Sequence, residues 1–363
     1  MLDPEVPPLP LGVRRRHSRY LRVRARIGVR VESLGRLKTA VIGVGEMGRN
    51  HVRIYNELEG TELVSICDTD AVRGGRISRI YKVPCFESAE KMLSSVEIDA
   101  VSVAVPTARH FEMASLAIEN GVDVLVEKPI DLSVERARTL VKKAKNRGVS
   151  LMVGHVERFN PAVMKMKEMI AELGDPTIAA ATRAGPLPNR VRDVSALVDL
   201  GVHDIDVLRY ALGSEVDRLY CECGRVIHKD QSDYGKILLS FKNGVVASVD
   251  INWLTPIKIR RLVVQGLKAM FEVDYIPQDL YKYDVSYVQE FSDFSDILLG
   301  MTEGEMRKIL VKKEEPLKIE LDLFVKSLAE GKEPPVTGED GIKAVQIALL
   351  AEESGRDHQV KKL

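Results

Sequence analysis

The sequence predicts an α/β protein in two parts. The first is a doubly wound parallel sheet, and the second is an α+β domain on an open, mainly antiparallel sheet. Between residues 37 and 155, short apolar segments alternate with segments of helical periodicity, which is typical of βαβ units. After residue 155 this alternation stops, and strand-like segments joined by short turns follow. With 363 residues, 45% of them hydrophobic, the chain is long enough for two packed cores.

The first predicted strand leads into a turn of the form Gly-x-Gly-x-x-Gly. An apolar run at 40–42 precedes three glycines at this spacing. The first glycine allows a tight turn, the second lets the backbone approach a pyrophosphate, and the third lets the following helix pack closely. The N–H groups at the start of that helix then face the phosphates. The turn therefore predicts a dinucleotide site formed by Gly43, Gly45, Glu46, Met47 and Gly48.

The second predicted strand, at 62–67, ends in Asp68, twenty residues after Gly48. A carboxylate at this place accepts hydrogen bonds from both hydroxyls of the adenosine ribose and repels a 2′-phosphate. We therefore predict NAD as the cofactor. NADP is the alternative, because the guanidinium of the nearby Arg73 could accommodate the extra phosphate.

Three more apolar segments, at 100–105, 122–126 and 151–153, complete the predicted parallel sheet. The helix expected at 134–147 begins after Ser133 and stops at Gly148. Open α/β sheets bind ligands at the carboxyl ends of their strands. The candidates at two such ends are Pro106, Thr107 and His110, and Glu127 and Lys128.

Lys128 is the candidate active-site cation, although its position alone would also suit a surface lysine. His110 has two equally weighted interpretations. It lies near the cofactor, or it bonds to backbone at the start of a helix.

Beyond residue 155 we expect a helix led by Asn160, a loop from Arg183 to Arg192, and a helix at 194–212. Two strands at 238–241 and 245–249 flank Lys242-Asn243-Gly244, and Asn-Gly is a strong signal for a hairpin. An open antiparallel sheet leaves a face that a partner subunit can cover, so we expect a homodimer or homotetramer. Helical periodicity returns after residue 315 and could pack on either part.

The helix expected at 194–212 carries a polar face. Asp199, His203 and Asp206 are spaced i, i+4 and i+7, so they share that face. A carboxylate one turn from an imidazole fixes its tautomer and raises its basicity, which predicts a general base. An exposed polar face is the simpler interpretation. Gly201 argues against it, because glycine inside a helix suggests that something approaches the backbone closely.

Charge and cysteine usage exclude several classes of function. The formal net charge is zero, which argues against nucleic acid as a partner. The first 38 residues hold ten Arg and Lys against three acidic residues. We expect 1–36 to be a basic, unfolded extension, with nucleic acid or anionic lipid as alternative partners. We expect no metal, because the four cysteines form no Cys-x-x-Cys pair. No secretory or membrane-spanning segment is evident, so the expected location is cytoplasmic.

Several motifs in order resemble the Gfo/Idh/MocA family of sugar and cyclitol dehydrogenases over residues 37 to 360. The motifs are Gly-x-Gly-x-x-Gly, Asp68, Val105-Pro106-Thr107-x-x-His110, Glu127-Lys128-Pro129 and Asp199-x-Gly201-x-His203. The resemblance implies an NAD-binding Rossmann domain at 37–155 and a substrate-binding and oligomerisation domain at 156–363. It also implies a catalytic set of Lys128, Asp199 and His203.

Two segments, 154–161 and 252–260, resemble the branch of this family that oxidises the 3-hydroxyl of UDP-N-acetylglucosamine or its uronate. Arginine pairs bidentately with phosphate oxygens, which suits a UDP-sugar substrate. Asn160 has a plainer interpretation as a helix N-cap. The 3-keto product would suit a pyridoxal-phosphate aminotransferase as a pathway partner. The expected substrate-binding residues are Arg158, Asn160, Arg190 and Arg192.

In the expected reaction, His203, oriented by Asp199, takes the hydroxyl proton while the hydride leaves for the nicotinamide. Lys128 polarises the developing carbonyl, and the two residues could exchange roles. Three alternatives remain: a free-sugar or inositol dehydrogenase on the same scaffold, an NAD-dependent glycosidase, and a catalytically silent NAD-binding regulator.

Overall fold

The computed structural model describes residues 35–187, 194–285 and 305–363, which form two compact units. The first unit contains the described residues up to Gly154 together with Glu320–Glu339, and the second contains the remainder. The second domain expected at 156–363 is therefore interrupted, because 320–339 packs with the first unit. The extension expected at 1–36 lies outside the described residues, apart from its last two.

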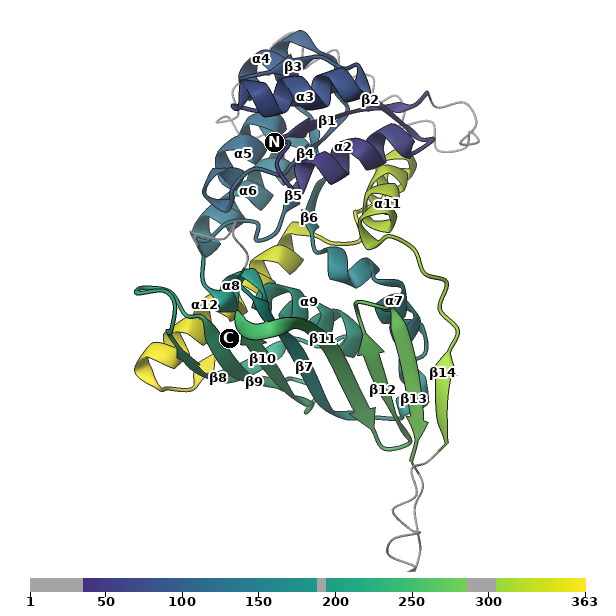
Figure 1. Cartoon of the computed structure of the whole chain (residues 1–363), viewed down its shortest axis with the longest axis vertical. Coiled ribbons are helices and arrows are strands. Elements are labelled where there is room, and N and C mark those ends of the chain that lie inside the picture. The colour runs from purple at the N-terminus through teal and green to yellow at the C-terminus, as the bar shows by residue number, and fades with distance from the viewer. Residues whose placement is uncertain (1–34, 188–193, 286–304) are drawn as a thin grey trace, which may run out of the picture. The chain divides into compact units, whose positions relative to one another are not determined.

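The first unit is built on the predicted doubly wound parallel sheet, with strands in the order β3-β2-β1-β4-β5-β6. The order reverses between β1 and β4. Because crossovers between parallel strands are right-handed, the helices lie on both faces of the sheet, as α2 and α5 do in Figure 1. The strands are β1 (Leu37–Ile42), β2 (Thr61–Cys67), β3 (Cys85–Phe86), β4 (Ala100–Val103), β5 (Asp123–Glu127) and β6 (Leu151–Gly154).

Local signals fix the ends of the helices in this unit. The Ser133 side chain accepts a hydrogen bond from Arg136 N, and Gly148 ends the helix with a left-handed φ of 64°, as predicted. Asp70 and Ser88 cap α3 and α4 in the same way. The helices are α2 (Gly48–Glu57), α3 (Ala71–Tyr81), α4 (Ala89–Ser95), the short η2 (Thr107–Arg109), α5 (His110–Glu119), α6 (Val134–Arg147) and α11 (Pro316–Glu330), whose first turn belongs to the second unit.

The second unit is built on a nine-stranded sheet in the described part of the chain, in the order β14-β13-β12-β11-β7-β10-β9-β8-β15. Only the β7–β10 pair in this set is parallel, so the predicted mainly antiparallel sheet is confirmed. The predicted hairpin joins β9 to β10, and Gly244 turns it with a φ of 89°. The strands are β7 (Pro176–Pro186), β8 (Val216–Gly224), β9 (Tyr234–Phe241), β10 (Val246–Asn252), β11 (Leu254–Gly266), β12 (Ala269–Asp274), β13 (Asp279–Asp284), β14 (Met306–Ile309) and β15 (Lys361–Lys362).

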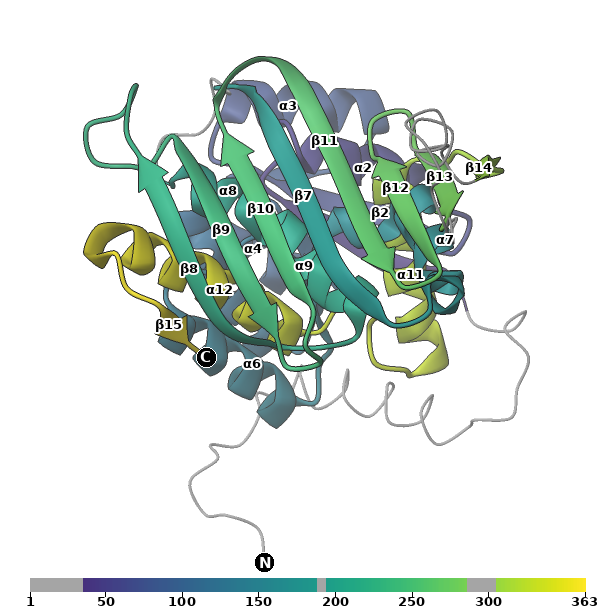
Figure 2. The same ribbon diagram turned by 90° about the horizontal axis from the view of Figure 1, so that it is seen from below.

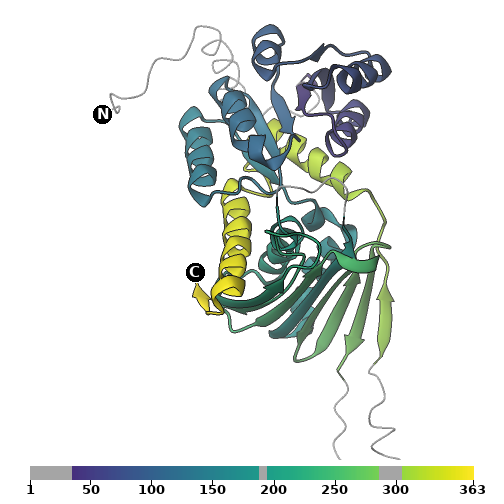
Figure 3. The same cartoon turned by 60° about the vertical axis from the view of Figure 1, so that its left-hand side comes forward.

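The helices of the second unit cover one face of this sheet, and Figure 2 shows the opposite face without helices over it. Along β9 and β10, buried residues alternate with exposed ones, as expected for a sheet with one covered face. The C-terminal helix, drawn in yellow, lies beside the end of the sheet that holds β8 (Figure 3). A Cβ on Gly355 of this helix would lie 2.3 Å from Cys223 Sγ in β8, so glycine allows the close packing. The helices are η3 (Val156–Phe159), α7 (Pro161–Glu168), η4 (Ile170–Leu173), α8 (Ala196–Asp199), α9 (Gly201–Leu212) and α12 (Gly338–Asp357), which begins in the first unit.

The single helix expected at 194–212 is two helices, because the chain is interrupted at Leu200 between α8 and α9. Ser195 caps the first by accepting from Val198 N. The close approach inferred at Gly201 is made by the protein itself, since a Cβ there would lie 2.9 Å from Ile251 Cδ1. Gly201 therefore serves the packing of α9 on β10.

Candidate active site

The glycine turn between β1 and α2 has the geometry that a dinucleotide site needs. Gly43 adopts a φ of 86°, and a Cβ on Gly48 would lie 1.8 Å from Gly43 O, so neither position accepts a side chain. At Gly45 no atom of the described residues lies within 4 Å of where a Cβ would be. The backbone at Gly45 is thus open to close approach, as expected for the glycine that faces the pyrophosphate.

Asp68, at the end of β2, ties the glycine turn to the next helix. Its Oδ2 accepts from Val44 N at 2.8 Å, and its Oδ1 accepts from Asp70 N at 2.8 Å. Arg73 donates to both oxygens, through Nε at 3.0 Å and Nη2 at 2.8 Å. Burial opposes the charged form, but the hydrogen bonds from Arg73 and the two amides hold the pKa of Asp68 below its usual value. The Asp68 carboxylate, which is expected to bind the ribose, is therefore charged. It is already paired with Arg73, the residue that could accommodate the 2′-phosphate of NADP.

This pairing makes a testable prediction about cofactor choice. We expect Asp68→Ala to weaken NAD binding about 10- to 100-fold, because a charge-assisted hydrogen bond to the ribose is lost, and to narrow the preference for NAD over NADP. Arg73 is 47% exposed on its side chain and can turn toward a 2′-phosphate. Arg73→Gln is the matched variant, and we expect it to widen the preference by weakening NADP binding. Titrations of both cofactors measure the two ratios, and an unchanged ratio in both variants contradicts a ribose role for Asp68.

Lys128 directly follows β5, so the structure places it at the carboxyl end of a parallel strand, as expected. Its side chain is partly exposed, and its backbone N donates to Glu127 Oε2 at 3.2 Å. Glu127 itself is buried, and its Oε1 lies 2.9 Å from His51 Nε2. Glu127 thus makes contacts within the protein, and its expected contact with the cofactor stays a prediction.

Pro106 and Thr107 lie between β4 and α5, where Pro106 is exposed and Thr107 begins η2. His110 is 1% exposed, with Nδ1 at 2.8 Å from Pro129 O and Nε2 at 2.9 Å from Val105 O. Burial lowers the pKa of His110, although both carbonyls favour the imidazolium. These contacts give His110 the backbone-bonding role of its two interpretations: it joins the β4–α5 loop to the Glu127-Lys128-Pro129 segment.

Asp199 and His203 belong to the second unit, in α8 and the first turn of α9, whereas Lys128 belongs to the first unit. Asp199 is buried, and His203 is partly exposed. Asp206 does not share their environment as the spacing had suggested. It is fully buried and accepts two hydrogen bonds from Arg158, at 2.6 Å each. The polar face therefore divides into a candidate catalytic pair and a structural carboxylate.

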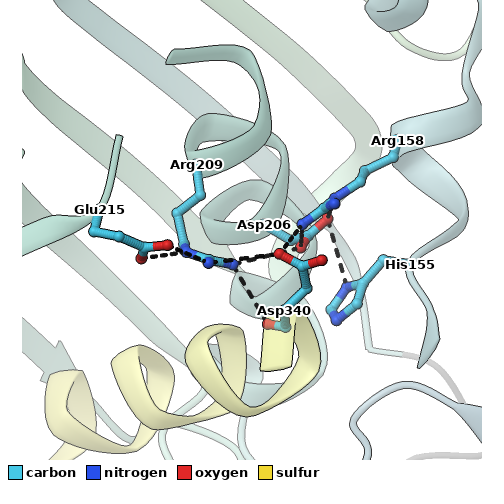
Figure 4. Close-up of polar contacts among 6 residues, drawn as sticks. All are labelled: His155, Arg158, Asp206, Arg209, Glu215 and Asp340. Atoms are coloured by element: carbon cyan, nitrogen blue, oxygen red, sulfur yellow. Dashed lines mark hydrogen bonds and ion pairs between the residues drawn. The ribbon is translucent and has the colours of Figure 1, made fainter. Parts of the chain in front are cut away.

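Arg158 lies in a buried ion network with α9 and α12 (Figure 4). In addition to its bonds with Asp206, Arg158 has its Nη2 atom 3.0 Å from Asp340 Oδ1. Arg209 extends the network, because its Nη2 atom lies 2.7 Å from Glu215 Oε1. Protein carboxylates thus already contact the Arg158 guanidinium, and its expected contact with a diphosphate stays a prediction.

Asn160 is likewise engaged within the protein. It caps α7 by accepting from Ala162 N, and it donates to Tyr275 O at 3.0 Å. The N-cap interpretation of Asn160 is therefore confirmed, and the side chain is 2% exposed. Arg190 and Arg192 lie outside the described residues.

A second buried network, around Arg183, was not predicted from the sequence. It was expected in a loop, but it lies in β7, fully buried, where it donates to Asp204 Oδ2 at 2.6 Å and Glu157 Oε1 at 2.7 Å. Arg260 also reaches Glu157, at 3.2 Å, and the Tyr275 ring lies 5.1 Å from the Arg183 guanidinium carbon. Ala179 and Ala181 are buried and Ala180 is exposed along β7, which places residue 183 on the covered face. Because all three residues are alanine, the sequence itself showed no alternation that could have signalled this burial.

Among the described residues, no group of three or more His, Cys, Asp or Glu side chains is placed to hold a metal ion. In the same part of the chain, no helix combines the length and apolar character needed to cross a membrane.

Two family profiles match the chain. Residues 37–155 match the oxidoreductase family with an NAD-binding Rossmann fold, and residues 163–272 match the GFO/IDH/MocA C-terminal domain. The chain belongs to the Gfo/Idh/MocA family. As a member of this family it is an NAD-dependent dehydrogenase, and its first unit is the NAD-binding domain.

Individual relatives of this Gfo/Idh/MocA protein differ in their substrates. UDP-N-acetylglucosamine 3-dehydrogenase of Acidithiobacillus ferrooxidans is 30% identical over 68% of this chain and 77% of its own length. A solved structure of that enzyme superposes with a TM-score of 0.80 at 26% identity, covering 88% of this chain and 98% of its own. scyllo-Inositol 2-dehydrogenase (NAD(+)) of Bacillus subtilis is 27% identical over 88% of this chain and 94% of its own length.

Proposed function

We propose that this protein oxidises the 3-hydroxyl of a UDP-sugar, with UDP-N-acetylglucosamine as the first candidate and NAD as the hydride acceptor. The observation that carries this proposal is its 30% identity with UDP-N-acetylglucosamine 3-dehydrogenase over two thirds of the chain. The ordered set of Lys128, Asp199 and His203 supplies the groups that such an oxidation requires.

The proposed chemistry divides between the two units. NAD supplies the acceptor for the hydride that leaves the sugar carbon. His203 accepts the proton of the same carbon's hydroxyl, so that a C–H and an O–H bond break and a C=O bond forms. Asp199, one turn before His203, orients the imidazole and stabilises its protonated form. Lys128 stabilises the developing charge on the carbonyl oxygen. NAD is proposed to be bound by the backbone of the glycine turn and by the Asp68 side chain.

A polyol dehydrogenase is the second candidate, because the inositol dehydrogenase of Bacillus subtilis aligns with a larger share of the chain. The contacts of Arg158 with Asp206 and Asp340 also favour this candidate, because a ring polyol needs no diphosphate ligand. In an inositol dehydrogenase, Lys128, Asp199 and His203 would keep the same roles on a ring hydroxyl.

We further propose that the open face of the second unit's sheet is the interface of a homo-oligomer. On this face Ile178 pairs with Val246 across β7 and β10, and Leu238 lies on the adjacent β9. These three side chains are 55%, 41% and 48% exposed. Apolar surface of this kind on an uncovered sheet is stabilised by a partner.

The four unbridged cysteines suit a reducing compartment, and we propose the cytoplasm as the location of the protein. There an aminotransferase would receive the 3-keto product.

The test of substrate class is NADH absorbance in mixtures of protein and NAD with UDP-N-acetylglucosamine, its uronate, N-acetylglucosamine, UDP alone, glucose or myo-inositol. We expect turnover with one UDP-sugar and none with the same sugar lacking UDP. Lys128→Ala protein is the control for contaminating activity. Turnover with myo-inositol alone would move the assignment to the polyol branch, and silence throughout would overturn the dehydrogenase assignment for all these sugars.

A further inference from the structure

A line of buried polar side chains in the first unit ends at the backbone of Lys128. Tyr55 OH lies 2.8 Å from Ser102 Oγ, which lies 3.0 Å from His51 Nδ1. His51 Nε2 lies 2.9 Å from Glu127 Oε1, and Glu127 Oε2 accepts from Lys128 N at 3.2 Å. Tyr55, Ser102 and His51 are each 0% exposed. This line joins α2, β4 and β5 to the residue proposed to act on the substrate.

The hydrogen-bonding capacities of these groups assign a direction to the line. A carboxylate only accepts, so His51 Nε2–H donates to Glu127, and a neutral His51 then accepts at Nδ1 from the Ser102 hydroxyl. Ser102 Oγ in turn accepts from Tyr55 OH, which stays protonated because burial raises its pKa. Every donor faces an acceptor. The far end is buried rather than open to solvent, so the line suits orientation of Glu127 and not proton release.

Glu127 is held from several sides. Burial favours its neutral form, yet the hydrogen bond from His51 and the neighbouring charge of Lys128 hold its pKa below the usual value. A Cβ on Gly154 would lie 3.1 to 3.2 Å from the carboxyl atoms of Glu127, so the backbone of Gly154 packs closely against this carboxylate. The carboxylate is therefore fixed, charged and directly adjacent to Lys128.

We propose that His51 is a positioning residue for Lys128: by fixing the Glu127 carboxylate, it sets the orientation and electrostatic environment of the lysine. This inference rests on the proposed function, in which Lys128 contacts the substrate oxygen. A residue that lies 76 positions before Glu127 in the chain, and that has no expected contact with substrate, thereby affects the reaction.

Three variants in α2 test the kinetic part of the proposal. His51→Leu removes both hydrogen bonds, and we expect kcat to fall about 10- to 100-fold, since small misplacement of a reacting group costs this much. The KM for NAD and sugar should change little. His51→Gln keeps an N–H for Glu127 and should restore most of the activity. Val52→Ala, also fully buried in α2, is the control for lost packing. An equal loss of kcat in Val52→Ala at equal stability, or an unchanged kcat in His51→Leu, would overturn the proposal.

A second readout needs no turnover. Trypsin does not cleave before proline, so Lys128 is the single lysine of the tryptic peptide 110–136 whether or not it is acetylated. Acetylation of native NAD-free protein, followed by mass spectrometry of that peptide, therefore reports the reactivity of Lys128 alone. In His51→Leu and Glu127→Gln we expect this reactivity to rise several-fold relative to surface lysines, because the carboxylate loses its fixed position in the first variant and is replaced by a neutral amide in the second.

The kinetic and acetylation measurements test the positioning role of His51 and the proposed reaction independently. Altered Lys128 reactivity in His51→Leu, combined with no sugar turned over by the wild type, would support the positioning role and reject the proposed reaction. Unaltered reactivity in a folded His51→Leu protein would overturn the positioning role, whatever the wild type oxidises.

Discussion

His203→Ala is expected to lower kcat by about 10²- to 10⁴-fold, the usual contribution of a general base, while NAD binding remains. The physical reason is that the hydroxyl proton must leave as the hydride leaves, and His203 is the partly exposed imidazole of α9 with a carboxylate, Asp199, at i−4. NAD is bound by the other unit, so its affinity should not depend on this side chain. Stopped-flow kinetics and NAD titration of the same preparation measure both quantities.

Two further variants show whether the loss is specific. Lys128→Ala should cause a comparable loss, and the pH dependence of kcat in the two variants identifies which group is the base. Asp206→Asn is the matched control on the same helix. Asp206 pairs with Arg158 in the interior, so its substitution should lower stability far more than it lowers kcat in the folded fraction. Normal turnover in His203→Ala would refute the proposed base.

Arg183→Met is expected to destabilise the second unit by about 3–5 kcal/mol, the typical cost of removing one partner of a buried ion pair. The guanidinium is 1% exposed and pairs with Asp204, which is 0% exposed, and with Glu157. Burial opposes its charge, but both carboxylates raise its pKa. Without it, Asp204 remains as a buried carboxylate that has lost its arginine. Urea unfolding followed by circular dichroism gives the free energy of unfolding of wild type and variant.

Arg209→Met is the matched control for this prediction. The Arg209 side chain is only 6% exposed, but its hydrogen-bonded partner Glu215 is 42% exposed and can be hydrated when the guanidinium is removed. The buried Asp206 near Arg209 keeps its two hydrogen bonds from Arg158. We therefore expect a much smaller loss, near that of a surface pair at about 1 kcal/mol. Equal losses in the two variants would show that burial of the carboxylate does not set the cost.

The free energy of unfolding that Arg183→Met loses relative to wild type should depend on pH in one direction. Arg183 is a principal cause of the lowered pKa of Glu157 in the folded wild type, acting against burial. A carboxyl whose pKa is lowered on folding contributes stability above its unfolded pKa and loses it as pH falls through the folded value. The deficit of the variant should therefore be largest near neutral pH and shrink in acid. A deficit independent of pH would contradict the electrostatic origin.

Signals that act over a few residues predicted much of the fold. The glycine turn before α2, the Ser133 cap and Gly148 stop of α6, and the Asn-Gly hairpin between β9 and β10 all occur as expected. Each depends on the conformations open to one residue or on a hydrogen bond to a residue three or four positions away. Alternating strands and helices then determine a parallel sheet, since crossovers allow little else.

The sequence by itself determined the NAD-binding turn, the place of Lys128 after β5 and the candidate pair Asp199 and His203, because each is a pattern of residues only a few positions apart. Only the tertiary structure decided which charged side chains are already paired. Arg158 meets Asp206 across 48 positions of the chain and His51 meets Glu127 across 76, and no spacing rule encodes either contact. The sequence does not distinguish a charged residue that binds substrate from one that pairs with a buried partner, because burial depends on the packing of elements far apart in the chain.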